Sequence, residues 1–340
     1  MQLRQNILAT LAYYDVLDMP LKAEEILARL INFKHLYGYK LPASSKLQRG
    51  EQTTNYKLEE IIKELDQLVL DGVTNRMGEY YFLFDREYLV PLRFKHEKIA
   101  KYKWRKAERA IRWLQFVPYL RAVFASGSLA MNNTDELSDL DVLIVIRNGR
   151  IWLARFLITV VLSLFRIRRR ASDRIAPDKI CPNHYITDKS LFILFKSIYT
   201  AQTYASLAPM YIYSPDLIED FKKSNAWVSS YVFNWNLGRS EENQQLRDPA
   251  SKLLVRLVEH LLDSSRLGNF LEKIARKTQK ERIASNPVTK QSGGRVVFND
   301  EQLEFHPRSI ETSIIRKYND NLLKLGLADF AIERDSGLTV

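Results

Sequence analysis

Asp139 and Asp141 are two carboxylates that stand one residue apart, at the start of the apolar run Leu140–Ile146. A short run of branched apolar residues predicts a buried strand. Because side chains alternate across a strand, both carboxylates point to the same face. Two neighbouring carboxylates repel one another unless a cation lies between them. Oxygen ligands of this kind suit Mg²⁺ or Mn²⁺, often together with substrate phosphates. The pair therefore predicts a site for a metal and a phosphate.

A turn of small residues, Ser126–Ser128, precedes this strand and follows the apolar stretch Ala122–Ala125. The central glycine lets the backbone approach a ligand closely, and the two serines add hydroxyl groups. Leu129–Met131 favours the opening of a helix, whose first amides would face an anion. The turn therefore predicts a phosphate site beside the carboxylates.

The order of strand, Gly-Ser turn, short helix and Asp-x-Asp strand resembles the DNA polymerase beta-like nucleotidyltransferase superfamily. That family carries Gly-[Gly/Ser] followed a short way along the chain by Asp-x-[Asp/Glu], matched here by Gly127-Ser128 and Asp139-Leu140-Asp141. The resemblance implies that the turn holds nucleotide phosphates and that the two acids hold Mg²⁺ or Mn²⁺. The nucleotide-binding candidates are Ser126, Gly127, Ser128 and Ser138, and the catalytic and metal-binding candidates are Asp139 and Asp141.

The same family usually carries a third acid on a later strand, which helps to take the acceptor proton or to bind the catalytic metal. The matching strand here is Ile180–Thr187, whose centre offers Asn183 and His184 but no acid. Three interpretations stay open. Asp188, just after the strand, or Asp178, just before it, supplies the acid after a shift of register. Alternatively, Asn183 or His184 stands in for it, although an amide cannot accept a proton as a carboxylate does. Otherwise the site binds nucleotide without turning it over.

The reaction that the resemblance implies is metal-dependent transfer of a nucleoside monophosphate from a nucleoside triphosphate (NTP) to a hydroxyl of an unknown acceptor, with pyrophosphate leaving. The missing third acid keeps a second function open, that of a catalytically weak, nucleotide-sensing regulator associated with nucleic acid. A weaker alternative is an enzyme that nucleotidylates a partner protein. The acceptor is thus a nucleic acid, a protein or another hydroxyl compound, and no motif identifies it or the oligomeric state.

The composition indicates a well-packed chain with an excess of positive charge. Hydrophobic residues make up 46% of its 340 residues, which is enough to build real cores, and the length suits two or three domains. The net charge of +11 favours anionic partners such as nucleotides, nucleic acid or an acidic membrane surface. Cys181 is the single cysteine, which excludes an intrachain disulfide framework. Together with the lack of a signal-peptide pattern at Met1, it predicts a cytoplasmic location.

Ile151–Ile167 is the most membrane-like segment. Arg155 interrupts it, and its longest uncharged run, Phe156–Phe165, is too short to span a bilayer. We therefore predict a buried core helix and no membrane span. Basic Arg166 and Arg168–Arg170 leave a peripheral membrane contact as a lesser alternative.

The hydrophobic pattern, together with the family resemblance, predicts an α+β fold with three domains. A winged-helix-like domain covers residues 1–90, a nucleotidyltransferase core with a small mixed sheet and a leading basic helix covers 91–190, and a helical C-terminal domain covers 191–340. In the first domain, three amphipathic helices precede a two-stranded hairpin, which resembles a winged helix. Its third helix, Leu58–Asp71, is rich in acids that would repel DNA phosphates, and this favours a protein contact.

Lysine and arginine concentrate on the long helix predicted around Arg93–Arg112. Its apolar seam indicates packing on one side, and its basic flank faces away. A basic flank of this kind is either a solvent-exposed surface or a positively charged path that guides phosphates toward the Gly-Ser turn. Both interpretations stay open at this point.

Overall fold

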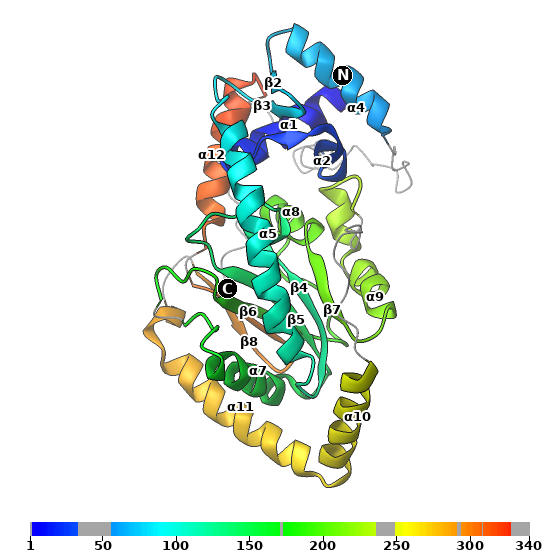
Figure 1. Ribbon diagram of the computed structural model, residues 1–340, viewed down its shortest axis with the longest axis vertical. Helices are drawn as coiled ribbons and strands as arrows, with labels where there is room; N and C mark the ends of the chain where they lie inside the picture. The colour runs from blue at the N-terminus through cyan, green and yellow to red at the C-terminus, as the bar shows by residue number, and fades with distance from the viewer. Residues whose placement is uncertain are drawn as a thin grey trace, which may run out of the picture.

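The computed structural model describes residues 2–32, 56–170, 173–235, 249–290, 294–307 and 309–327. Within these ranges the fold is mixed α and β, and its centre is a six-stranded sheet in the order β7-β4-β5-β6-β9-β8 (Figure 1). Neighbouring strands are antiparallel, except for β5 and β6, which are parallel. The strands are β4 (Leu120–Ala125), β5 (Leu140–Ile146), β6 (Ile180–Thr187), β7 (Ala208–Ile212), β8 (Arg295–Phe298) and β9 (Gln302–His306).

Helices cover both faces of this sheet. Leu140, Val142 and Ile144 pack on the face covered by α5, α7 and α11, whereas Leu143 and Val145 pack on the face covered by α8 and α9. Alternation along β5 therefore turns its one acid toward the second face. The helices are α5 (Leu89–Leu114), α6 (Gly127–Ala130), α7 (Ile151–Leu164), α8 (Ile198–Ala205), α9 (Asp216–Ser224), α10 (Pro249–Ser264) and α11 (Leu267–Ser285), with 3-10 turns η1 (Ala226–Ser230) and η2 (Pro287–Lys290).

The N-terminal part forms a helical unit with its own three-stranded sheet, at the top of Figure 1. The helices and the hairpin expected there are present, and the strands pair in the order β1-β3-β2. Its core includes residues of α12, whose Tyr318 ring lies edge-on to Tyr13, with ring centroids 5.7 Å apart. The elements are α1 (Gln2–Val16), β1 (Leu21–Lys22), α2 (Ala23–Ala28), α4 (Leu58–Leu70), β2 (Asn75–Met77), β3 (Tyr80–Phe82) and α12 (Glu311–Lys324).

The expected helical C-terminal domain over residues 191–340 needs correction. Three strands of the central sheet, β7, β8 and β9, come from this segment, and α12 packs on α1 in the N-terminal unit. Asn321 of α12 donates a hydrogen bond to the carbonyl of Ala12 at 3.1 Å. These strands are short, and β7 contains Pro209, which suits its place at the sheet edge. Pairing with distant strands stabilises them, and a local hydrophobic pattern does not report such pairing.

The apolar segment around α7 is a core helix, as the sequence predicts. Trp152, Ile158 and Leu162 are buried against the sheet and α11. In the part of the chain that the structure describes, no helix combines the length and the apolar character needed to cross a bilayer. This helix, α7, forms part of the crossover between the parallel strands β5 and β6. The crossover returns the chain to the N-terminal end of β5, where Asp139 and Asp141 lie.

Candidate functional site

Asp139 and Asp141 meet a third side chain at the start of the parallel strands. One ligand atom each from Asp139, Asp141 and Cys181 lie within 4.8 Å of one another, and no other such cluster of three occurs among the described residues. Asp141 is paired with Cys181 in the register of β5 and β6. The two carboxylates therefore lie close together, with Asp141 in β5 and Asp139 directly before it. Cys181 is the residue that sequence reasoning missed, because only the pairing of the strands brings it there.

Gly127 lies directly against Asp141. A Cβ atom at position 127 would be 3.1 Å from Oδ2 of Asp141, and the glycine has φ +61°, a backbone conformation that other residues rarely adopt. The backbone N–H of Ser126 donates to the carbonyl of Asp141 at 3.0 Å. The turn and the acids are thus neighbours in space. The helix that follows, α6, has only four residues, so it is a single turn rather than the extended helix that would focus a dipole on an anion.

A guanidinium group already neutralises one of the acids. Nη1 of Arg169 forms a hydrogen-bonded ion pair with Oδ2 of Asp139 and lies 3.9 Å from Sγ of Cys181. The backbone N–H of Arg169 donates to the carbonyl of Ile180 at 2.9 Å, which ties this segment to the start of β6. The cation that two adjacent carboxylates require is therefore supplied, for Asp139, by a side chain of the protein itself.

Among the described residues, Asp141 has no guanidinium partner of this kind, and this affects the pKa of its carboxyl group. Burial, followed by the negative charge of Asp139, raises the pKa of Asp141 to about 7. Burial and the charges of Asp141 and Asp139 also raise the pKa of the Cys181 thiol well above its ordinary value. Cys181 is consequently a neutral thiol at physiological pH, and it cannot act as the missing carboxylate.

Asn183 is the residue that β6 places beside the pair. Its Nδ2 donates a hydrogen bond to Oδ1 of Asp141 at 2.8 Å. The register between β5 and β6 shifts between Asp141 and Leu143, so that Cys181 and His184 are both paired with residues of one face of β5. Pro182 lies within this irregularity, where its missing N–H costs no ladder hydrogen bond.

His184 lies deeper in the same face and does not reach the acids. It is buried, with its ring nitrogens against the hydroxyl of Tyr204 and, at 2.9 Å, the Nε2 of Gln302. Burial lowers the pKa of His184 well below its usual range. It is therefore a neutral core histidine, and of the two stand-ins that the sequence proposes for the third acid, only Asn183 contacts the pair.

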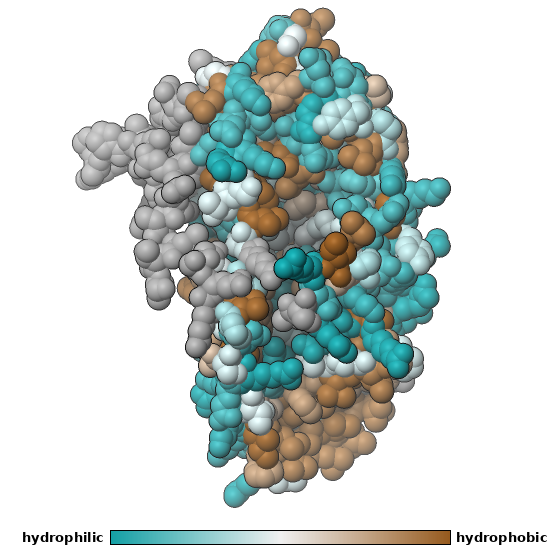
Figure 2. Space-filling model, turned by 90° about the vertical axis from the view of Figure 1, so that its left-hand side faces the viewer, coloured by the Kyte–Doolittle hydropathy of each residue, from teal (hydrophilic) through white to brown (hydrophobic). Residues whose placement is uncertain are grey.

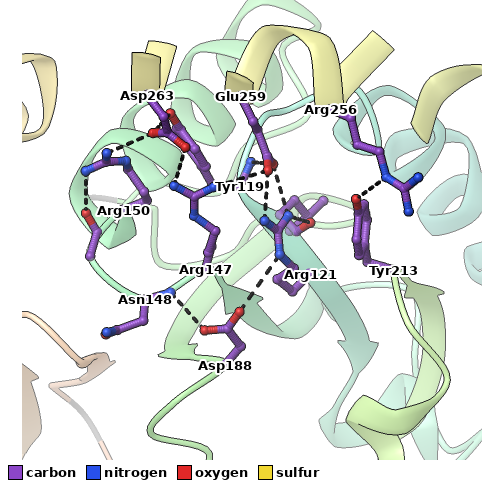
Figure 3. Close-up of polar contacts among 12 residues, drawn as sticks. Tyr119, Arg121, Arg147, Asn148, Arg150, Asp188, Tyr213, Arg256, Glu259 and Asp263 are labelled. Carbon is purple, nitrogen blue, oxygen red and sulfur yellow. Dashed lines mark hydrogen bonds and ion pairs between the residues drawn. The ribbon is translucent and has the colours of Figure 1, made fainter. Parts of the chain in front are cut away.

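Asp188 lies at the opposite end of β6 from Cys181, roughly 20 Å away along the strand. Its Oδ1 accepts a hydrogen bond from the backbone N–H of Asn148 at 2.9 Å, and its Oδ2 faces Arg121 at 3.9 Å (Figure 3). Asp188 belongs to a network in which Arg121 and Arg147 bind acids of α10. The proposed role of Asp188 as a catalytic third acid is therefore not supported by its position.

Asp178 and Ser138 also have structural partners. Asp178 forms ion pairs with Lys103 at 3.0 Å and Lys106 at 2.5 Å, and these lower the pKa of its carboxyl. The hydroxyl of Ser138 donates to Oδ1 of Asp135 at 2.6 Å, and its backbone carbonyl accepts from Lys103 at 2.5 Å. Ser138 thus closes the turn that leads into β5, and its hydroxyl is committed to that turn.

The basic helix α5 divides into a structural part and an exposed part. Arg93 and Lys103 are buried, Arg93 against Glu25 at 2.9 Å and Lys103 against Asp178. These two residues attach the helix to the rest of the fold. They are therefore not part of a surface that could guide phosphates toward the Gly-Ser turn. The basic residues that remain exposed on α5 are Lys95, Lys98, Lys101, Arg105, Arg109 and Arg112.

The site as a whole is a pair of carboxylates at the N-terminal ends of the parallel strands β5 and β6, with a glycine turn on one side and a neutral thiol and an amide on the other. Two carboxylates are a donor set that a hard divalent cation accepts, whereas a protonated thiol is not a ligand for such a cation. Comparison of the chain with family models, with curated proteins and with solved structures gave no match.

Proposed function

We propose that this protein is a metal-dependent nucleotidyltransferase with Asp139 and Asp141 as its metal-binding residues. The observation that carries this is the contact of Gly127 with Asp141, so close that a Cβ atom on the glycine would lie 3.1 Å from the carboxylate. This contact joins the Gly-Ser turn to the paired acids. A phosphate lying on the turn would be within reach of a cation held by the acids. That combination is what phosphoryl transfer requires.

Each residue of the site has a definite role in this proposal. Asp139 and Asp141 hold Mg²⁺ or Mn²⁺, which when bound neutralises phosphate charge and polarises the phosphorus–oxygen bond. The backbone at Gly127 lies close to the triphosphate, and the Ser128 hydroxyl is a donor to it. Arg169 lies next to the pair and would be free to bind a phosphate if a divalent cation replaced it at Asp139.

In the part of the chain that the structure describes, this arrangement lacks a carboxylate that could accept the proton from the acceptor hydroxyl. Asn183 stands where a third carboxylate would take the proton, and an amide cannot do so. This observation favours a second candidate function, a nucleotide-sensing regulator that binds NTP with metal and leaves it intact. In that case the acceptor hydroxyl has no partner, and the site reports nucleotide to another part of the molecule.

The N-terminal unit fits a protein contact better than DNA recognition. The exposed acids Glu59, Glu60 and Asp66 lie on α4, the helix that would enter a major groove in a winged-helix protein, and they would repel phosphates. Exposed Ile62 and Leu70 lie on the same helix. We propose that this winged-helix-like unit binds a protein.

An assay for transfer of label from NTP to an acceptor distinguishes these functions. The full chain is incubated with α-labelled NTPs and with RNA, DNA or protein acceptors, with and without Mg²⁺ or Mn²⁺. Metal-dependent transfer that is lost in the Asp139→Asn, Asp141→Asn double variant supports the enzyme. Intact NTP bound only with metal supports the sensor, and transfer that survives in the double variant would sink the proposed mechanism.

A further inference from the structure

Helix α10 carries its acids inward and most of its leucines outward. Glu259 is buried and forms an ion pair with Arg121 at 2.9 Å, and Asp263 accepts hydrogen bonds from Arg150 at 2.9 Å and from the hydroxyl of Tyr119 at 3.1 Å (Figure 3). A helix on the surface of a globular protein normally shows the reverse arrangement. The polar side of α10 is thus already satisfied by the protein.

The outward side of α10 is an apolar stripe. Leu253, Leu257 and Leu261 follow one another at helical spacing, and Leu253 is 73% exposed. Ion pairs with the sheet hold α10 in this orientation, so the stripe is not the result of a loosely attached helix. Leucines that stay in water at a well-anchored position indicate a surface that another body covers.

Exposed apolar residues also lie on α11, which packs against α10, and on α7, which packs against α11. Phe270 and Ile274 of α11 are exposed, as are Val160 and Leu164 of α7, with Leu164 at 75%. Helix α11 packs against both α7 and α10. Figure 2 shows hydrophobic residues gathered at the lower end of the molecule, where α7 and α11 lie in Figure 1. We call this the apolar surface of α7, α10 and α11.

The exposed charges on these three helices are mainly positive. Among the described residues of these three helices, Glu281 is the single exposed acid, because Glu259 and Asp263 bind arginines and Glu272 accepts from the backbone N–H of Trp152 at 3.0 Å. The exposed bases on the same helices are Arg256, Lys273, Arg276, Lys277 and Arg282. Apolar and cationic side chains therefore occur together on the exposed sides of these helices.

We propose that this face docks on the surface of an anionic lipid bilayer. Helices that lie in a membrane interface combine an apolar side with lysine and arginine, and their affinity grows with buried apolar area and with anionic lipid. A second copy of the chain would bring like charges together at the same face, which disfavours self-association. This inference does not rest on the proposed nucleotidyltransferase activity.

Vesicle flotation of the full chain tests this inference. The vesicles contain either phosphatidylcholine alone or phosphatidylcholine with phosphatidylserine. We expect binding to the anionic vesicles to be at least about tenfold stronger, and to fall as salt is added. Replacement of Leu253, Leu257 and Leu261 by serine should lower the partition coefficient by about tenfold or more, since each exposed leucine loses its burial in the interface.

Two controls keep the outcome decisive. The double variant Ile62→Ser, Leu70→Ser removes exposed apolar residues from α4, at the other end of the molecule, and should bind vesicles like the parent chain. The double variant Lys273→Glu, Lys277→Glu should lose the preference for anionic lipid while its circular dichroism spectrum stays unchanged. Failure of the parent chain to bind anionic vesicles at low salt would overturn the inference. So would a dimer in sedimentation that the three serine substitutions dissociate.

Discussion

Gly127 and Asp141 approach one another so closely that a Cβ atom on the glycine would lie 3.1 Å from the carboxylate Oδ2. The residues belong to the two separate motifs from which the sequence predicts a site. Their contact means that the position of the acid depends on the absence of a side chain in the turn. It also places the turn that we propose to bind phosphate against a carboxylate that we propose to bind a metal ion.

Replacement of Gly127 by alanine should therefore weaken metal binding. The positive φ costs an alanine about 1–2 kcal/mol, and the new methyl group displaces Asp141. Gly78→Ala is a matched control, because Gly78 also has φ +61° but a Cβ atom added there would have nothing within 4 Å. We expect similar losses of thermal stability in both variants. Titration calorimetry with Mn²⁺ should show about tenfold weaker binding in Gly127→Ala alone, and equal affinities would contradict the contact's importance.

Removal of Arg169 should make the thermal stability of the protein depend more strongly on bound metal. Without its guanidinium, Asp139 and Asp141 face each other with no cation, so the metal-free protein should lose on the order of 1 kcal/mol of stability. Added Mg²⁺ should then raise the melting temperature of Arg169→Ala more than that of the parent chain. Arg170→Ala, an exposed neighbour, serves as the control in the same thermal-shift series. An identical Mg²⁺ shift in all three proteins would contradict the competition.

The metal-free protein should lose stability as the pH rises through neutrality, because of Asp141. The folded state holds its pKa at about 7, above the ordinary value of 3.8, so between these values the folded state keeps a proton that the unfolded chain has released. The free energy of unfolding therefore falls as pH rises from about 4 to about 7. Urea unfolding at a series of pH values should show this slope in the parent chain and a flatter one in Asp141→Asn. Parallel curves for the two proteins would show that Asp141 titrates normally.

An acid at position 183 should strengthen the site. Asn183→Asp places a carboxylate next to Asp141, so Mn²⁺ affinity should rise about tenfold while the metal-free protein loses about 1–2 kcal/mol through crowded charges. Asp188→Asn should leave Mn²⁺ affinity unchanged, since Asp188 binds the backbone of Asn148 at the far end of β6. Calorimetry measures both, and the label-transfer assay shows whether a third carboxylate increases turnover. No gain in affinity for Asn183→Asp would exclude this position as a ligand.

Glu259 should be one of the most important residues for stability outside the site. Its carboxylate is buried, accepts from the backbone N–H of Tyr119 at 2.5 Å and pairs with Arg121. Glu259→Ala should cost about 3–5 kcal/mol, because it leaves the arginine without its main partner. Glu281→Ala, exposed on α11, should change the free energy of unfolding by less than about 0.5 kcal/mol. Guanidinium unfolding checks both, and a small effect at Glu259 would mean that the network is dispensable.

Local sequence was sufficient for the elements that carry their own pattern. Strand β5, helix α7 and helix α4 form close to the predicted ranges, because each is a contiguous run whose apolar spacing matches its structure. Alternation along the chain was also sufficient to predict that Asp139 and Asp141 lie together, although Asp139 directly precedes β5. Strand β7 and strand β9 were missed, because short strands depend on partners that are distant in the chain.

Residue type and alternation are local properties, so the amino-acid sequence alone indicates that two acids and a glycine turn form one site. What completes that site depends on the tertiary structure. Pairing of β5 with β6 brings Cys181 and Asn183 to the acids, and the return of the chain after α7 brings Arg169 to Asp139. Asp188 lies at the opposite end of β6. These relations depend on the register between β5 and β6 and on the irregularity between Asp141 and Leu143. Both arise from contacts between segments that are far apart in the chain.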